Sequence, residues 1–164
     1  WPVAGRVALA ALLFAGAGAT WSIVGPLVRP LGADLSARNS PVATLSVDGI
    51  GARDAAGPFR VTARPGQEVA LRAEGPPGAM FLIGRGAPSP ACQGHPYGGV
   101  LDIEVSNALQ PEEIVFGGVF DGDGRAATTW TVEPLPDGRM PGLQMLVFHP
   151  AEGTTSAAFY FERP

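Results

Sequence analysis

The sequence contains no lysine, a single cysteine and two histidines. Its 11 basic residues are all arginine, and charged residues make up 16% of the chain, which carries a formal net charge of −4. One cysteine cannot form an internal disulfide. From Pro41 onward, 14 acidic residues accompany 8 scattered arginines, so this part lacks the clustered basic patch that neutralises nucleic-acid phosphates. We therefore expect no nucleic-acid partner.

Charge is also missing from the run Val7–Val28, which Arg6 and Arg29 flank. As a helix that rises about 1.5 Å per residue, this run reaches about 33 Å, the thickness of the hydrocarbon core of a bilayer. The run therefore predicts a retained transmembrane helix. The alternative is a cleaved signal peptide, for which Ala17-Gly18-Ala19 offers a cleavage site.

The predicted organisation is an anchor over residues 1–28, a linker over residues 29–40 and a domain over residues 41–164. We expect this domain to lie outside the cytoplasm, in the periplasm or in the extracellular space. Small residues recur on one side of the predicted anchor helix, where they let a second helix approach closely, although Ala and Gly are also frequent throughout the chain. The candidate helix-packing face consists of Ala11, Ala15, Gly16, Ala19 and Thr20.

Beyond residue 40, short apolar runs alternate with turn signals rich in Pro, Gly and Asp. Several runs have the period-two alternation of half-buried strands, as in Val69, Leu71 and Ala73. This spacing predicts an all-β domain, an antiparallel β-sandwich of seven to nine strands. The expected strands are Val42–Val47, Phe59–Ala63, Glu68–Ala73, Met80–Ile83, Leu101–Val105, Ile114–Phe120, Ala126–Val132, Leu143–Phe148 and Ala157–Glu162. The expected turns are Arg64-Pro65-Gly66, Gly75-Pro76-Pro77-Gly78, Asp121-Gly122-Asp123-Gly124 and Pro136-Asp137-Gly138.

Large apolar side chains within these runs are the candidate core. We expect Phe116, Trp130, Leu146 and Phe159 to be largely buried. One helical turn is expected in residues 107–113, because proline followed by two glutamates is typical of a helix start.

Two strand–turn–strand units carry a resemblance to a known family. They are Val119-Phe120-Asp121-Gly122-Asp123-Gly124-Arg125-Ala126 and Pro141-Gly142-Leu143-Gln144-Met145-Leu146-Val147-Phe148. Through them, residues 42–163 resemble the immunoglobulin-like and fibronectin-like β-sandwich modules of bacterial surface proteins. The Cys…Trp…Cys signature of immunoglobulin domains is absent. The resemblance implies a sandwich and no particular activity.

The longest stretch without strand character is Gly84–Gly99, which we expect to be a loop. Long loops inside compact domains are often functional. Its prolines limit the entropy that is lost on ordering, and several of its side chains are of kinds enriched at interfaces. The candidate partner interface consists of Arg85, Cys92, His95 and Tyr97.

The same stretch contains two candidate metal ligands. Cys92 and His95 are spaced as C-x-x-H, which is similar to the copper loop of cupredoxins. That family places another His well before the Cys, whereas His149 follows it, so the pattern fails. A c-type haem needs a second Cys, and zinc needs more ligands than these residues supply. Asp121-Gly122-Asp123-Gly124 superficially resembles a calcium loop but is typical of a hairpin turn. We expect no metal and no cofactor.

Catalytic constellations are also missing from the sequence. Ser89 and Ser106 lack a nucleophile-elbow context, and the acid pairs Glu112-Glu113 and Asp102/Glu104 are typical of solvated faces. We therefore expect a non-catalytic accessory or structural subunit of a membrane protein complex, for example photosynthetic or respiratory, whose partners are the membrane and other subunits. A surface adhesion or ligand-binding module is one alternative, and a minor exported enzyme is another.

Overall fold

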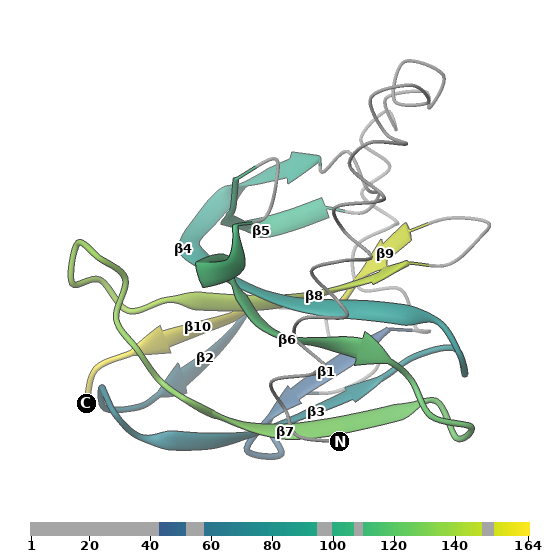
Figure 1. Ribbon diagram of the computed structural model, residues 1–164. Coiled ribbons are helices and arrows are strands. Elements are labelled where there is room, and N and C mark those ends of the chain that lie inside the picture. The colour runs from purple at the N-terminus through teal and green to yellow at the C-terminus, as the bar shows by residue number, and fades with distance from the viewer. Residues whose placement is uncertain (1–42, 52–57, 95–99, 107–109, 149–152) are drawn as a thin grey trace.

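A computed structural model describes residues 43–51, 58–94, 100–106, 110–148 and 153–164 (Figure 1). The predicted anchor, linker and helix-packing face, together with His95 and Tyr97, lie outside these residues and stay predictions. Within the described ranges the chain is all β, apart from a short 3-10 helix at Pro111–Glu113. No helix in this described part is long and apolar enough to cross a membrane.

Every strand expected from the sequence is present, and one was missed. The missed strand, β9, has three residues and no apolar run, so periodicity gives no signal for it. The described strands number ten, where seven to nine were expected. They are β1 (Thr44–Val47), β2 (Phe59–Thr62), β3 (Glu68–Glu74), β4 (Met80–Gly94), β5 (Val100–Glu104), β6 (Ile114–Val119), β7 (Arg125–Thr131), β8 (Gly142–Phe148), β9 (Gly153–Thr155) and β10 (Phe159–Glu162).

These strands form two sheets. The smaller has three strands in the order β1-β3-β7. The larger has the order β2-β10-β8-β4-β5, with β6 also paired to β4 and β9 to β8. The expectation of purely antiparallel pairing was wrong, because β10 pairs with β2 in parallel. These two strands are distant in the sequence, so no tight turn dictates their relative direction.

The main core lies between the two sheets. The strand β3 shows the expected alternation, with Val69, Leu71 and Ala73 buried between exposed neighbours. From the large sheet, Phe81 and Phe159 complete this core, and the Phe81 ring stacks on Phe120 at 4.5 Å between ring centroids. Each core member has less than one tenth of its surface exposed: Ala43, Leu45, Val47, Val61, Ala63, Val69, Leu71, Ala73, Ala79, Phe81, Ile83, Phe120, Val132, Met140, Leu143, Met145, Val147, Phe159 and Phe161.

The four expected core residues differ in burial. Phe159 and Leu146 are buried, as predicted. Phe116 and Trp130 are only partly buried, because they pack at the margin of the core. Trp130 nevertheless contacts Phe161 edge to face, with 5.5 Å between the ring centroids.

The turn Asp121–Gly124 does not join two strands of one sheet, as a hairpin would. It carries the chain from β6 in the large sheet to β7 in the small sheet. The Asp121 carboxylate stabilises the turn, since its Oδ1 accepts hydrogen bonds from the main-chain N–H groups of Asp123 (2.9 Å) and Arg125 (2.8 Å). Gly124 has a φ of +74°, and a Cβ there would lie 2.3 Å from the carbonyl oxygen of Gly75. The turn therefore requires glycine at position 124.

Candidate functional site

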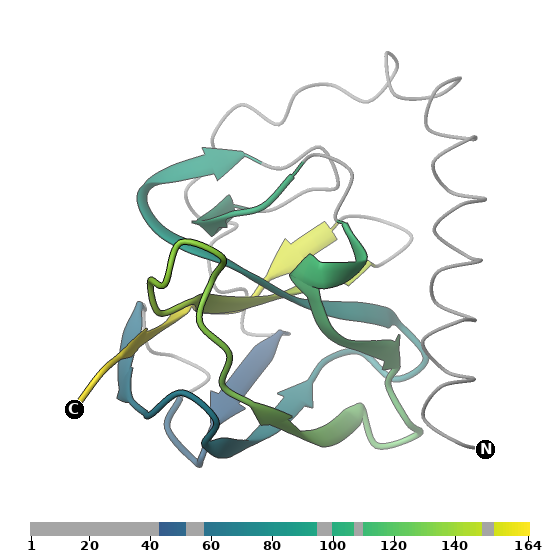
Figure 2. The ribbon, with the colours of Figure 1, turned by 60° about the vertical axis from the view of Figure 1, so that its left-hand side comes forward.

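The stretch expected to be a loop is mostly strand, so that prediction was wrong for Gly84–Gly94. All of these residues belong to β4, which leaves the large sheet and continues into a hairpin with β5 (Figures 1 and 2). The first part of β4, Met80–Gly86, pairs with β8, and the later part pairs with β5. The register shifts between Pro88 and Gln93. Proline is tolerated at such irregular positions because it lacks the N–H group that a regular ladder needs.

Two glycines let this hairpin lie close against the outer face of the large sheet. Gly86 and Gly142 are register partners on β4 and β8. A Cβ on Gly86 would lie 1.9 Å from the carbonyl oxygen of Glu104, and one on Gly142 would lie 2.6 Å from Cγ2 of Ile103. The hairpin can therefore approach this closely only because side chains are missing there.

A second apolar layer, separate from the main core, forms where the hairpin meets the sheet. Leu82, Leu101, Ile103 and Leu146 have at most 2% of their surface exposed, yet none belongs to the core between the sheets. As a result β8 is buried on both faces, with Leu143, Met145 and Val147 on one side and Gln144 and Leu146 on the other. A strand buried on both faces has no polar alternation, which explains why β8 is apolar apart from Gln144.

A polar layer crosses this apolar contact, and Gln144 is its centre. Its side-chain Oε1 accepts a hydrogen bond of 2.7 Å from the main-chain N–H of Asp102 in β5. Its Nε2 donates one of 2.9 Å to the main-chain oxygen of Ser156, which follows β9. The hydroxyl of Tyr160 in β10 donates a 2.8 Å bond to the main-chain oxygen of Asp102. The two bonds to Asp102 hold the hairpin to β8 and β10, and the bond to Ser156 joins β8 to the segment after β9.

The hydroxyl group of Ser156 also forms hydrogen bonds within the fold. Its Oγ accepts a 3.0 Å hydrogen bond from the N–H of Met145 and donates a 2.8 Å bond to the oxygen of Ala157. Gln144, Ser156 and Tyr160 were not among the predicted site residues. The detectable signal was a lone amide in an otherwise apolar strand, since a buried amide needs hydrogen-bond partners elsewhere.

Of the candidate interface residues, Arg85 is the one whose side chain is described. Its Nε donates a 2.7 Å hydrogen bond to the main-chain oxygen of Glu112, and its Nη1 lies 3.1 Å from Oε2 of Glu133. The side chain is 18% exposed. This guanidinium therefore joins the 3-10 helix to the segment after β7, which is a role within the fold. Cys92 lies in β4, and its side chain is outside the described part of the structure.

The acidic residues occupy different environments from one another. The helical turn expected at Pro111 is present as the 3-10 helix, and the Glu113 carboxylate stabilises it from within. Its Oε1 accepts from the N–H of Ser106 (2.8 Å), and its Oε2 accepts from the Ser106 hydroxyl (2.5 Å) and the N–H of Gln110 (2.7 Å).

Asp102 is buried, so the expectation of a solvated Asp102/Glu104 face holds for Glu104 alone. At Asp102, β5 is bonded to the large sheet through Gln144 and Tyr160.

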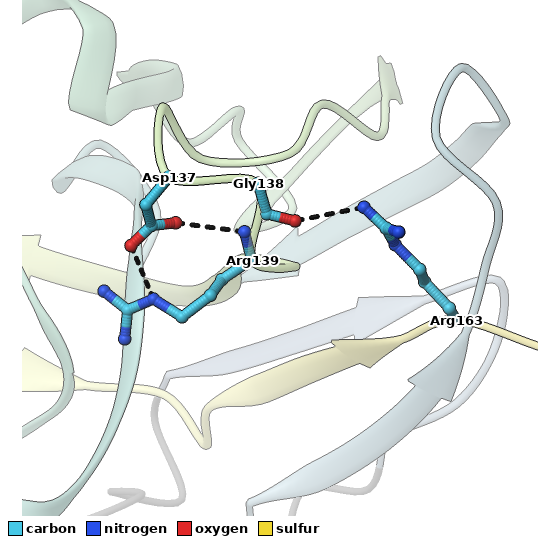
Figure 3. A network of polar contacts seen from close by, with 4 residues as sticks. All are labelled: Asp137, Gly138, Arg139 and Arg163. Carbon is cyan, nitrogen blue, oxygen red and sulfur yellow. Dashed lines mark hydrogen bonds and ion pairs between the residues drawn. The ribbon is translucent and has the colours of Figure 1, made fainter.

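A turn of exposed charges lies at Leu135–Arg139, between β7 and β8 (Figure 3). The carboxylate of Asp137 accepts hydrogen bonds from the main-chain N–H of Arg139 (3.0 Å) and from its Nε (2.6 Å). These two contacts, the main-chain one first, lower the pKa of Asp137 from its ordinary value of 3.8. Arg163 donates a 3.0 Å bond to the oxygen of Gly138 and so ties the C-terminal segment to this turn.

Taken together, Arg85, Glu113, Gln144 and Ser156 bind main-chain groups or other side chains of the fold. Within the described ranges, His, Cys, Asp and Glu side chains form no group of three that could hold a metal ion. The chemistry that this arrangement supports is that of a fixed scaffold, in which a hairpin is held on one face of a two-sheet domain. No protein-family model and no curated protein matches the sequence.

Proposed function

We propose that this chain is a non-catalytic, membrane-tethered accessory subunit whose β domain, outside the cytoplasm, binds a partner protein through the end of the β4–β5 hairpin. The single observation that carries the proposal is the way the hairpin is attached. Its base is fixed by the close approach at Gly86 and by the Gln144 polar layer.

A fixed hairpin favours binding on physical grounds. Ordering a mobile segment costs conformational entropy on association, so a segment whose two ends are already held pays less. Gly94 ends β4 and Val100 begins β5, so both ends of residues 95–99 are continuous with the hairpin. His95 and Tyr97 lie in that connection, and such side chains are typical of interface cores.

The tether and the module class belong to the proposal as well. The uncharged run Val7–Val28 supports membrane attachment, since its length matches a hydrocarbon core. The two sheets around one core support the resemblance to immunoglobulin-like sandwich modules. The polar layer supports a non-catalytic role, because Gln144, Ser156 and Tyr160 bind main-chain groups.

Purification of the full chain in mild detergent, followed by identification of the proteins that co-purify, tests this proposal. A variant with both His95→Ala and Tyr97→Ala is expected to lose the partner while its melting temperature is unchanged. The matched control is Arg72→Ala, which removes an exposed side chain from β3 in the other sheet. Arg85 is unsuitable for this test because its contacts are internal. Retention of the partner by the double variant would overturn the proposal.

A further inference from the structure

The strand β7 forms an edge of the small sheet. It has seven residues and pairs with β3 along its whole length, without any irregularity in the register. In the described part of the chain, β3 is its single strand partner, because the sheet order is β1-β3-β7. The other side of β7 therefore presents main-chain groups that could pair with a further strand.

The groups on this open side can be identified. Gly75 donates to the oxygen of Gly124 (2.9 Å), and Val132 donates to the oxygen of Gln67 (2.8 Å), so the even-numbered positions of this segment bond toward β3. In an antiparallel ladder the alternate residues bond to the opposite side. The open positions are therefore Arg125, Ala127, Thr129 and Thr131.

One of these positions is already satisfied. The N–H of Arg125 donates to the Asp121 carboxylate (2.8 Å), and its oxygen accepts from the N–H of Asp121 (3.1 Å). Among the residues that the structure describes, Thr129 receives on this side one long contact, 3.3 Å from its neighbour's hydroxyl to its oxygen. Ala127 and Thr131 receive none. Each main-chain oxygen keeps a second lone pair, so all three residues can still pair with a new strand.

Natural edge strands usually carry protection against further pairing, such as lysine, proline, a bulge or short length. β7 has no lysine, no proline and no bulge, and its outward side chains after Arg125 are small. At one edge of the large sheet, β2 differs, because it has four residues and prolines at positions 58 and 65 bracket it. β1, at the opposite edge of the small sheet, also has four residues.

We propose that β7 pairs with β7 of a second copy of this chain, antiparallel and centred on Thr129, so that two three-stranded sheets become one continuous sheet. In this register Thr129 faces Thr129 of the second copy, and Ala127 faces Thr131. Every open N–H and C=O group of these residues then gains a partner, while Arg125 keeps its bonds to Asp121. A register shifted by two residues either leaves Ala127 without a partner inside β7 or competes with Asp121 for Arg125.

The side chains agree with a second copy as the occupant. Threonine pairs across antiparallel strands are favourable, and small neighbours let the strands approach without a clash. At both ends of the paired segment the register sets Arg125 across from Glu133 of the second copy. Arg125 is exposed, and the Glu133 side chain is 64% exposed despite its contact with Arg85, so opposite charges meet.

Cysteine cross-linking of the full chain in mild detergent tests both the pairing and its register. In a Cys92→Ser background, chains with Thr129→Cys are expected to cross-link with a short bismaleimide, because residues facing each other lie about 5.5 Å apart. Chains with Ala127→Cys and chains with Thr131→Cys are expected to cross-link when mixed. Neither is expected to do so alone, because identical positions then lie roughly 13 Å apart along the strand.

A second variant checks the hydrogen bonds. Thr129→Pro removes an N–H group that faces the open edge, and is expected to weaken dimerisation about tenfold or more. Thr129→Val keeps that N–H group and is the matched control, and both are compared by light scattering and by melting temperature. A monomeric full chain would overturn the proposal and leave the edge to another protein. Efficient cross-linking of Ala127→Cys chains alone would overturn the register, and unchanged dimerisation of Thr129→Pro would overturn the pairing.

Discussion

Replacing Gly86 by alanine is the sharpest test of how the hairpin is attached. The new Cβ would lie 1.9 Å from the Glu104 main-chain oxygen, roughly 1.5 Å short of ordinary van der Waals contact. This oxygen belongs to a paired strand, since Glu104 faces Ala87 in the β4–β5 ladder, so it cannot swing away as a side chain would. The hairpin must therefore lift from the sheet or the strand must bend.

Lifting the hairpin has a calculable cost. Overpacking of this kind costs about 1–3 kcal/mol. Movement of β5 would also strain the bonds of Gln144 and Tyr160 to Asp102, each contributing about 1 kcal/mol. We expect the free energy of unfolding to fall by roughly 3–5 kcal/mol and the melting temperature to fall by about 10–20 °C.

Thermal unfolding followed by circular dichroism measures this effect. The matched control is Gly122→Ala, because a Cβ there meets nothing within 4 Å. We expect that control to melt within about 2 °C of the unmodified chain, as surface substitutions usually do. A melting temperature for Gly86→Ala equal to that of the control would refute the proposed close approach of the hairpin.

Other substitutions probe single contacts. Gln144→Ala is expected to lower the free energy of unfolding by about 2–4 kcal/mol in urea titrations, because it leaves buried main-chain groups without partners. Arg85→Ala should cost about 1–3 kcal/mol by the same assay, since it removes a hydrogen bond from a charged group, whereas Arg85→Lys should recover part of the contact to Glu133. Trp130→Ala should cost about 3 kcal/mol, the lower end for an aromatic residue, because Trp130 is only partly buried. The lowered pKa of Asp137 means that its contacts stabilise the fold above pH 3.8 and are lost as the pH falls; an NMR titration should give a pKa below 3.8, and 1 M salt should reduce the shift.

The positions of the strands could be predicted because their signals are local. Alternation in Val69, Leu71 and Ala73 marks a face, and the turn at Asp121–Gly124 has the residues that its backbone requires. The parallel pairing of β2 with β10 has no such signal, because it joins strands that are far apart in the sequence. Local sequence patterns therefore predict where the strands lie better than they predict which strands pair.

The stretch Gly84–Gly94 shows why the candidate site was only partly predictable. Glycine and proline are usually turn signals, so the sequence indicated a loop. In the fold, Gly86 provides room for β5, and Pro88 lies beside an irregular register. The same residue types thus have a packing role that depends on what lies opposite them.

By itself, the sequence determined the all-β class, the places of nine strands and the turns between them, because hydrophobic period and turn chemistry act over a few residues. Only the tertiary structure decided that Arg85 and Gln144 serve the fold from within, and that β8 is buried on both faces. It also left β7 with one open side. The physical reason is that burial, hydrogen-bond partners and free edges depend on which segments, distant in the sequence, come into contact. No local sequence pattern specifies those contacts.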